Sequence, residues 1–280
     1  AQLTELKEMV TQDYRFGVLQ GAQNRADKMK VTIQDQFVHG GWPESFNDFI
    51  TDLVTYPCAF LKGPVIRRQR RVKYDQSSEV TTVVADEIIA PEFERVDPFD
   101  IYPEPGVSNI NEGYLFEHHK LSRSDLSDLI GVPGYDEEAI RYLLDMGDNE
   151  YGSWITQDFE YTKDQEENKY YSHRRPTTMF DALEFWGKVS GKMLVEWGMD
   201  EEMIPDQAKE YDANVWVIGN YVLKAVLNYD PLGEKPYAKT SFIKAPGAFW
   251  GKGIPEIIED VQNVCNAASR ALVNNMGISS

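Results

Sequence analysis

Two groups of side chains have residue types and spacings that suit binding to a charged partner. The first group is basic, with five positive charges within seven residues at Arg67, Arg68, Arg70, Arg71 and Lys73. Such a cluster can bind phosphates or an acidic protein surface. It is more typical of a solvated hairpin edge, where charges discourage edge-to-edge pairing of strands. The residues alone leave both interpretations open.

The second group lies along the C-terminal segment, which has the periodicity of an amphipathic helix. Pro255 suits the first turn of a helix, and the acidic residues beside it suit the positive end of the helix dipole. The apolar residues from Ile254 to Leu272 form one wide stripe, which predicts tight packing on that side. The other side, which would border water or a partner, carries Glu256, Glu259, Asp260, Asn263, Arg270 and Asn274.

The remaining residues match no common catalytic motif. The sequence has neither a Gly-x-x-x-x-Gly-Lys-Ser/Thr loop nor a Gly-x-Gly-x-x-Gly loop after a strand. The nearest imitation, residues 247–253, contains two bulky aromatic residues, so we interpret it as a structural turn. Adjacent residues on a strand point to opposite faces, so His118 and His119 are not expected to share a metal. Cys58 has no histidine nearby and is interpreted as a buried thiol.

Carboxylates are plentiful, but their spacing does not indicate hydrolysis. Glycoside hydrolysis needs two carboxylates on either side of one bond, and adjacent pairs do not provide that geometry. We interpret the adjacent pairs as solvated faces: Glu137-Glu138, Glu166-Glu167 and Glu201-Glu202. A hydrolase would need two carboxylates that are distant in the sequence to converge in the fold. We therefore expect a protein that is not an enzyme and that needs no metal or cofactor.

Composition supports a folded, acidic protein. Of the 280 residues, 42% are apolar, which is enough for a sizeable core, and the net charge is −18. This charge repels phosphate backbones and anionic membranes at long range, so tight DNA binding by the whole surface is not expected. The sequence shows no signal peptide and no apolar run of roughly 20 residues, and its two cysteines have no disulfide or zinc spacing. We expect a soluble, intracellular protein without membrane contacts.

The elements that must position these residues indicate the α+β class. Helical periodicity and turn residues predict helices in the first third, closing near Gly40, and from Pro43 to before Pro57. We then expect a β-hairpin over residues 62–95 and an irregular, proline-rich loop over 97–106. We next expect two short helices, one capped by Ser122 or Ser124 and the other by Asp136, and then an exposed linker over 148–178. Hairpins are expected over 183–197 and 214–226, followed by the C-terminal helix.

Three blocks, residues 58–68, 96–103 and 249–262, together resemble the portal protein, or head-to-tail connector, of tailed bacteriophages of the short-tailed type. The blocks occur in the same order as in that family. The most specific is the glycine turn that leads into a helix containing Gln262 and Asn266. The likeness spans about residues 20–280.

The resemblance implies a portal-like α+β fold with a helical and β wing, long stem helices and a small β-rich clip domain. Residues 1–120 would form the wing, and 121–178 would be helices and an exposed loop leading to the stem. Residues 179–246 would form the clip, and 247–280 a stem helix. The channel loop and crown that follow this helix in the family would be missing.

The resemblance also implies a function. Portal subunits form a ring, here expected to hold twelve copies, at one capsid vertex of the virion after assembly in the host cytoplasm. Double-stranded DNA passes through the ring during packaging and ejection. The implied partners are the terminase large subunit, the capsid and scaffolding proteins and the tail adaptors. Two alternatives remain: a carbohydrate-active hydrolase with acidic residues in an aromatic cleft, and another head-to-tail adaptor, which usually has a much shorter chain.

Overall fold

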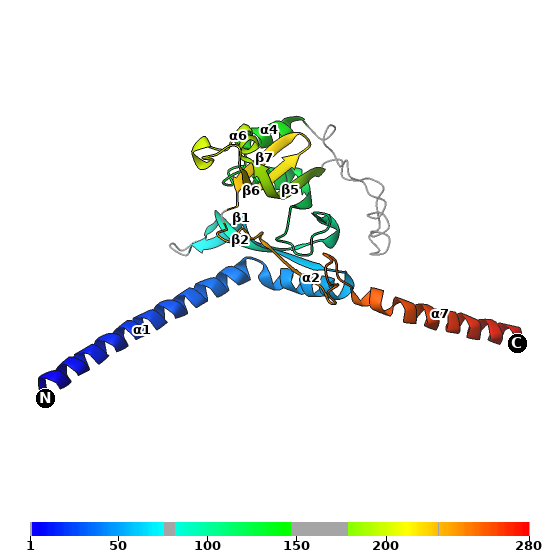
Figure 1. The fold of residues 1–280 in the computed structure, drawn as a ribbon, viewed down its shortest axis with the longest axis horizontal. Helices are drawn as coiled ribbons and strands as arrows, with labels where there is room; N and C mark the ends of the chain where they lie inside the picture. Colours follow the sequence, from blue (N-terminus) through cyan, green and yellow to red (C-terminus); the bar gives the residue numbers. More distant parts are fainter. Residues whose placement is uncertain (1, 76–81, 147–178, 229, 280) are drawn as a thin grey trace.

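The computed structural model describes residues 2–75, 82–146, 179–228 and 230–279, with side chains for 18–67, 90–146, 179–228 and 230–278. Two β-sheets and several short helices form a central body (Figure 1). Two long helices, α1 (Gln2–His39) and α7 (Ile254–Ser279), leave this body in opposite directions (Figure 1). None of the helices in these ranges combines the length and apolarity that a bilayer crossing demands.

The first two helices meet at a glycine corner. Helix α1 ends at His39, and α2 (Trp42–Thr55) begins after Gly41, whose φ of 76° favours glycine. A Cβ atom at Gly40 would lie 2.7 Å from the carbonyl oxygen of Pro91, so the chain passes too close to β2 for a side chain. The prediction of two helices separated near Gly40 is confirmed.

The first sheet has the order β2-β1-β8. Strands β1 (Ala59–Asp75) and β2 (Thr82–Val96) pair antiparallel, which confirms the predicted hairpin, although its turn lies outside the described residues. Strand β8 (Tyr237–Thr240) pairs with the first residues of β1. This long-range pairing brings the chain back to the first sheet shortly before α7 begins.

The second sheet is antiparallel, with the order β3-β4-β5-β6-β7. It consists of five strands: β3 (Ile101–Pro103), β4 (Leu115–Ser122), β5 (Met179–Ser190), β6 (Glu210–Ile218) and β7 (Tyr221–Leu227). The short β3 and the 3-10 helix η1 (Pro98–Asp100) lie within the predicted proline-rich loop. Because β3 is an edge strand, it tolerates Pro103.

One of the two hairpins expected in the later half is present. The β6–β7 hairpin turns at Gly219, as predicted. The hairpin expected over residues 183–197 is wrong, because helix α6 (Gly191–Glu196) follows β5. The Ser190 hydroxyl accepts a hydrogen bond from the Met193 amide and caps this helix. The helical turn buries Leu194 completely in a cluster with Ile204, which lies just after the 3-10 helix η2 (Glu201–Met203).

Two further helices pack against the second sheet. Helix α3 (Arg123–Asp128) has a capping box between Ser122 and Asp125, and α4 (Glu137–Met146) is capped by Asp136. Their fully buried residues Leu126, Ile140 and Leu143 share a core with Phe180 and Ile218 of the sheet. Both helices were predicted from their caps. The linker expected over residues 148–178 lies outside the described residues.

The molecule is therefore of the α+β class, as predicted, with two antiparallel sheets. The strands link regions that the sequence assigned to different domains. Strand β5, at the start of region 179–246, pairs with β4 of the N-terminal half, while β8, near the end of that region, joins β1. The division into regions 1–120, 121–178, 179–246 and 247–280 stays a prediction.

Candidate functional site

A cluster of buried charged residues lies where the two sheets meet. Lys62 comes from β1, while Glu117 and Glu184 face each other across the pairing of β4 and β5. Their side chains are 2%, 4% and 3% exposed. Lys62 Nζ donates to Glu117 Oε2 over 2.5 Å and also contacts Glu184 Oε2. One ammonium group thus bridges two carboxylates from the opposite sheet.

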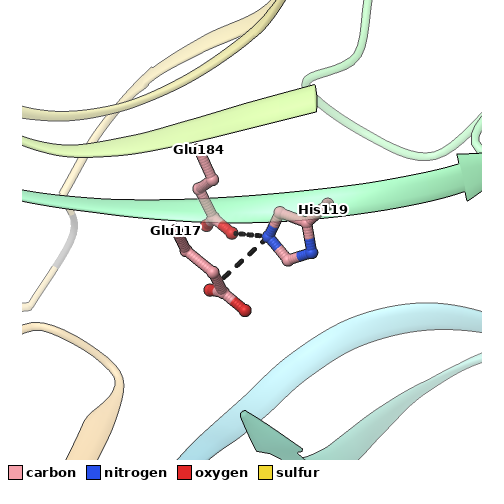
Figure 2. A group of neighbouring side chains, drawn as sticks. All are labelled: Glu117, His119 and Glu184. Atoms are coloured by element: carbon pink, nitrogen blue, oxygen red, sulfur yellow. Dashed lines mark hydrogen bonds and ion pairs between the residues drawn. The ribbon is translucent and has the colours of Figure 1, made fainter. Parts of the chain in front are cut away.

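His119 completes the charged part of this cluster. Figure 2 shows the two carboxylates beside its ring, with Nε2 2.9 Å from Glu184 Oε2 and 3.5 Å from Glu117 Oε2. The other face of the cluster is aromatic, since the His119 ring stacks on Trp216 at a centroid distance of 4.4 Å. With His119 protonated, two positive charges balance two negative charges.

Neutral groups donate further hydrogen bonds to both carboxylates. Trp186 Nε1 and Asn214 Nδ2 each donate to Glu184 Oε1 over 2.8 Å. The Tyr237 hydroxyl, on β8, donates to Glu117 Oε2. Buried ions are tolerated when they are paired and hydrogen-bonded in this way. The cluster therefore links both sheets through several strands.

Burial and charge act in opposite directions on these groups. Burial opposes the charged form of Lys62, but the adjacent carboxylates outweigh this effect and raise its pKa. Burial likewise raises the pKa values of Glu117 and Glu184, but Lys62 and His119 reverse the effect and hold both below the ordinary range. The pKa of His119 is raised, because Glu117 and Glu184 outweigh the burial of the ring. The cluster is therefore an ionised network.

Glu117, His119 and Glu184 also have the types and spacing of metal ligands. Their ligand atoms lie within 4.8 Å of one another. Carboxylates with a histidine suit several divalent cations. However, Lys62 Nζ contacts both carboxylates and supplies the positive charge that a metal would bring. We therefore interpret this cluster as an ion network that holds the sheets together.

His118 belongs to a second network on the other face of β4. Its Nε2 lies 3.0 Å from Asp181 Oδ1, and its Nδ1 lies 3.4 Å from Asp100 Oδ1. Burial opposes protonation, but the hydrogen bonds to Asp100 and Asp181 raise the pKa of His118 to about 9. The adjacent histidines point to opposite faces of the strand, as predicted.

The polar residues predicted on the C-terminal helix lie along α7, and none of them lines any of three cavities in the described part of the chain. Residues 255–278 are all exposed, so water reaches both the polar and the apolar side. Glu256 pairs with Lys252 at 3.2 Å within the same chain. The polar group consists of Glu256, Glu259, Asp260, Asn263, Arg270 and Asn274. The exposed large apolar residues are Ile257, Ile258, Val261, Val264, Leu272, Val273, Met276 and Ile278.

The glycine turn before α7 fixes the point at which the helix leaves the body. A Cβ atom at Gly253 would lie 2.8 Å from the carbonyl oxygen of Thr55, so the turn packs directly on the end of α2. Lys252 pairs with Ile243 through two backbone hydrogen bonds. The buried Phe249 lies in one core cluster with Cys58. The predictions of a structural turn and a buried thiol are confirmed.

The basic cluster is described only in part. Arg67 on β1 contacts Glu94 and lies 3.6 Å from Glu92, both on β2. It is therefore paired within its own sheet. For the other four basic residues the structure describes the backbone, which belongs to β1, but not the side chains. These residues are Arg68, Arg70, Arg71 and Lys73. Their contact with phosphates or a partner stays a prediction.

Comparisons with known proteins add no relative. The sequence matches no family model, and no curated protein shows significant similarity to it.

Proposed function

We propose that this chain is a structural subunit that assembles with copies of itself through α7, and that the assembly is the portal ring of a tailed bacteriophage. The observation that carries this proposal is the exposure of α7. Val261, Val264 and Leu272 are 64–69% exposed on a helix of 26 residues. No described part of the chain covers them.

An apolar stripe of this length favours burial against a partner. Burying one such side chain contributes roughly 1.5–3 kcal/mol. Exposed apolar patches of this kind mark interaction surfaces in soluble proteins. A second copy can cover the stripe while the acidic and amide side chains of α7 face water. In a ring, these residues would border the channel.

The proposal of a ring and of its role rests on the resemblance to portal proteins in residues 58–68, 96–103 and 249–262. In the proposed ring the chain conducts double-stranded DNA during packaging and ejection. It would dock the terminase large subunit, the capsid and scaffolding proteins and the tail adaptors at one vertex of the virion. The net charge of −18 supports this role, because an acidic wall does not hold a moving phosphate backbone.

The charged cluster at Lys62 argues against the alternative of a glycoside hydrolase. That chemistry needs one protonated carboxylic acid as a proton donor. Lys62 contacts both Glu117 and Glu184 and holds the pKa values of both below the ordinary range. Neither carboxylate would carry a proton at neutral pH. The cluster fits a structural role in the proposed ring subunit.

Negative-stain microscopy combined with light scattering tests the proposal. We expect the purified chain to form rings with a central hole. The double substitution Val261→Asp and Leu272→Asp should abolish ring formation and leave monomers. As a matched control, Asn263→Asp and Asn274→Asp add the same charge on the polar side and should leave the rings intact. A wild-type chain that stays monomeric at every concentration, or rings of equal yield from both double variants, would refute assembly through α7.

A further inference from the structure

A cavity of about 600 Å³ lies beside the charged cluster, between the beginning of β1 and the second sheet. Its volume falls within the range of small-molecule sites. The lining includes three aromatic residues, Tyr135, Trp186 and Trp216, and three residues with polar side chains, Lys62, Asn214 and Lys224. Flat apolar surfaces with a few polar groups are typical of ligand sites.

Two buried polar atoms of the lining residues have no hydrogen-bond partner. Trp216 is 6% exposed and Asn214 is 1% exposed. Trp216 Nε1 is a donor and Asn214 Oδ1 is an acceptor, and neither has a partner. Buried polar groups in folded proteins are nearly always satisfied, so unpaired atoms on two residues that line a cavity favour an occupant that supplies a partner.

Lys224 adds a cation to the same wall. Its Nζ lies 5.0 Å from the ring centroid of Tyr135. Among the described side chains, no carboxylate forms an ion pair with it. Burial lowers the pKa of Lys224 despite the opposing influence of Glu184. A half-buried ammonium group without a counter-ion favours the binding of an anion.

The acidic residues of the lining do not replace this missing anion. Glu184 already contacts Lys62 and His119. Asp230 accepts hydrogen bonds from the backbone amides of Leu232 and Glu234 in its own loop. The side chain of Glu234 is exposed. The ammonium group of Lys224 and the aromatic side chains of the wall are therefore available to bind a ligand.

We propose that this cavity binds a small molecule that carries one anionic group, a carboxylate or a phosphate, on a flat ring. The anionic group pairs with Lys224. The ring packs against Trp216 and Tyr135, while the indole N–H of Trp216 donates to the ligand. Asn214 Oδ1 accepts a hydrogen bond from a donor on the ligand. This site does not depend on ring assembly, so it is tested separately.

Binding of benzoate, phenyl phosphate and neutral benzamide to the full chain tests the proposal. Tryptophan fluorescence and ligand-observed NMR report saturable binding. We expect benzoate or phenyl phosphate to bind, and benzamide to bind at least tenfold more weakly. The tighter of the two anions identifies the acid class of the ligand. If neither anion binds at millimolar concentration, the cavity holds only water and the proposal fails.

Three variants locate the binding site. Lys224→Met should weaken anion binding at least tenfold, and Trp216→Phe, which removes the indole N–H, should weaken it severalfold. Lys188→Met removes an exposed lysine of β5 outside this cavity and should bind as the wild type does. Circular dichroism checks that each variant is folded, and Trp216→Phe carries the test if Lys224→Met does not fold. Equal affinities of the Lys224 and Lys188 variants would overturn the proposal.

Discussion

The ammonium group of Lys62 lies 2.5 Å from Glu117 Oε2 and joins the first sheet to the second. The same nitrogen contacts Glu184, so one residue of β1 is paired with two adjacent strands of the other sheet. The contact between the two sheets therefore includes a buried positive charge, which two buried carboxylates neutralise.

Replacing Lys62 by methionine should strongly destabilise the fold. The methionine fills a similar volume but leaves two buried carboxylates, Glu117 and Glu184, with His119 as their one remaining cationic partner in the cluster. Removing one partner of a buried ion pair costs about 3–5 kcal/mol. Urea unfolding followed by circular dichroism measures the loss. A loss below about 1 kcal/mol, the value of a surface pair, would contradict the role of this network.

The matched control is Arg141→Met on α4. Arg141 pairs with Glu137 at 3.1 Å, but its side chain is 65% exposed. An exposed i, i+4 pair contributes only about 0.3–0.5 kcal/mol. We therefore expect this variant to unfold at nearly the same urea concentration as the wild type. Both variants remove one positive charge. The difference between their free energies of unfolding therefore measures the effect of burying the ion pair.

His118 should make the fold less stable in alkaline solution. Its pKa is raised to about 9 in the folded chain, against an ordinary value near 6.5. The stabilisation is complete below about pH 6.5 and is lost as the pH rises through 9, because the unfolded chain releases the proton first. The expected loss in the free energy of unfolding is about 2–3 kcal/mol.

Urea unfolding at several pH values between 6 and 10 measures this loss. In the variant His118→Asn the decline between pH 6.5 and 9 should be much smaller. His39, exposed at the end of α1, provides the control, and His39→Asn should keep the wild-type profile. If the His118 variant loses as much stability across this range as the wild type, the raised pKa is not the cause.

Gly253 and Gly277 should respond in opposite ways to alanine. At Gly253 a Cβ atom would lie 2.8 Å from Thr55 O and 3.0 Å from Tyr56 O, so the turn must move away from α2. Overpacking of this kind costs about 1–3 kcal/mol. At Gly277 nothing lies within 4 Å, so alanine should favour α7 by about 0.5–1 kcal/mol.

Thermal unfolding of both alanine variants, followed by circular dichroism at 222 nm, measures these changes. The Gly253 variant should unfold at a lower temperature than the wild type, and the Gly277 variant should retain or gain helical signal. A Gly253 variant as stable as the wild type would show that the turn does not hold α7 against α2.

Local signals allowed the sequence to predict most helices and two of the strand pairs. Asp136 and Ser122 marked helix starts correctly because capping depends on a few adjacent residues. Ser190 and Gly191 were interpreted as a hairpin turn, although Ser190 caps a helix. The helix is favoured over the hairpin because it buries Leu194. This tertiary contact cannot be recognised from the residues around Ser190 alone.

The charged cluster was missed because its charged members come from three strands, β1, β4 and β5, that are distant in the sequence. Glu184 does carry a signal, since it is a charged residue between Leu183 and Phe185 in a predicted strand. Such a residue must either face water or find a buried partner. Which partner it finds depends on strand order, and spacing along the chain does not determine that order.

The projection of α7 away from the body has a consequence for how this helix forms. A lone helix of 26 residues gains little from its own hydrogen bonds in water, because helical stability in proteins comes mainly from packing. If other copies of the chain supply that packing, folding of the C-terminal helix is coupled to association of the copies. The helical signal of this segment should then rise with protein concentration, so dilution alone would unwind it while the two sheets stay folded.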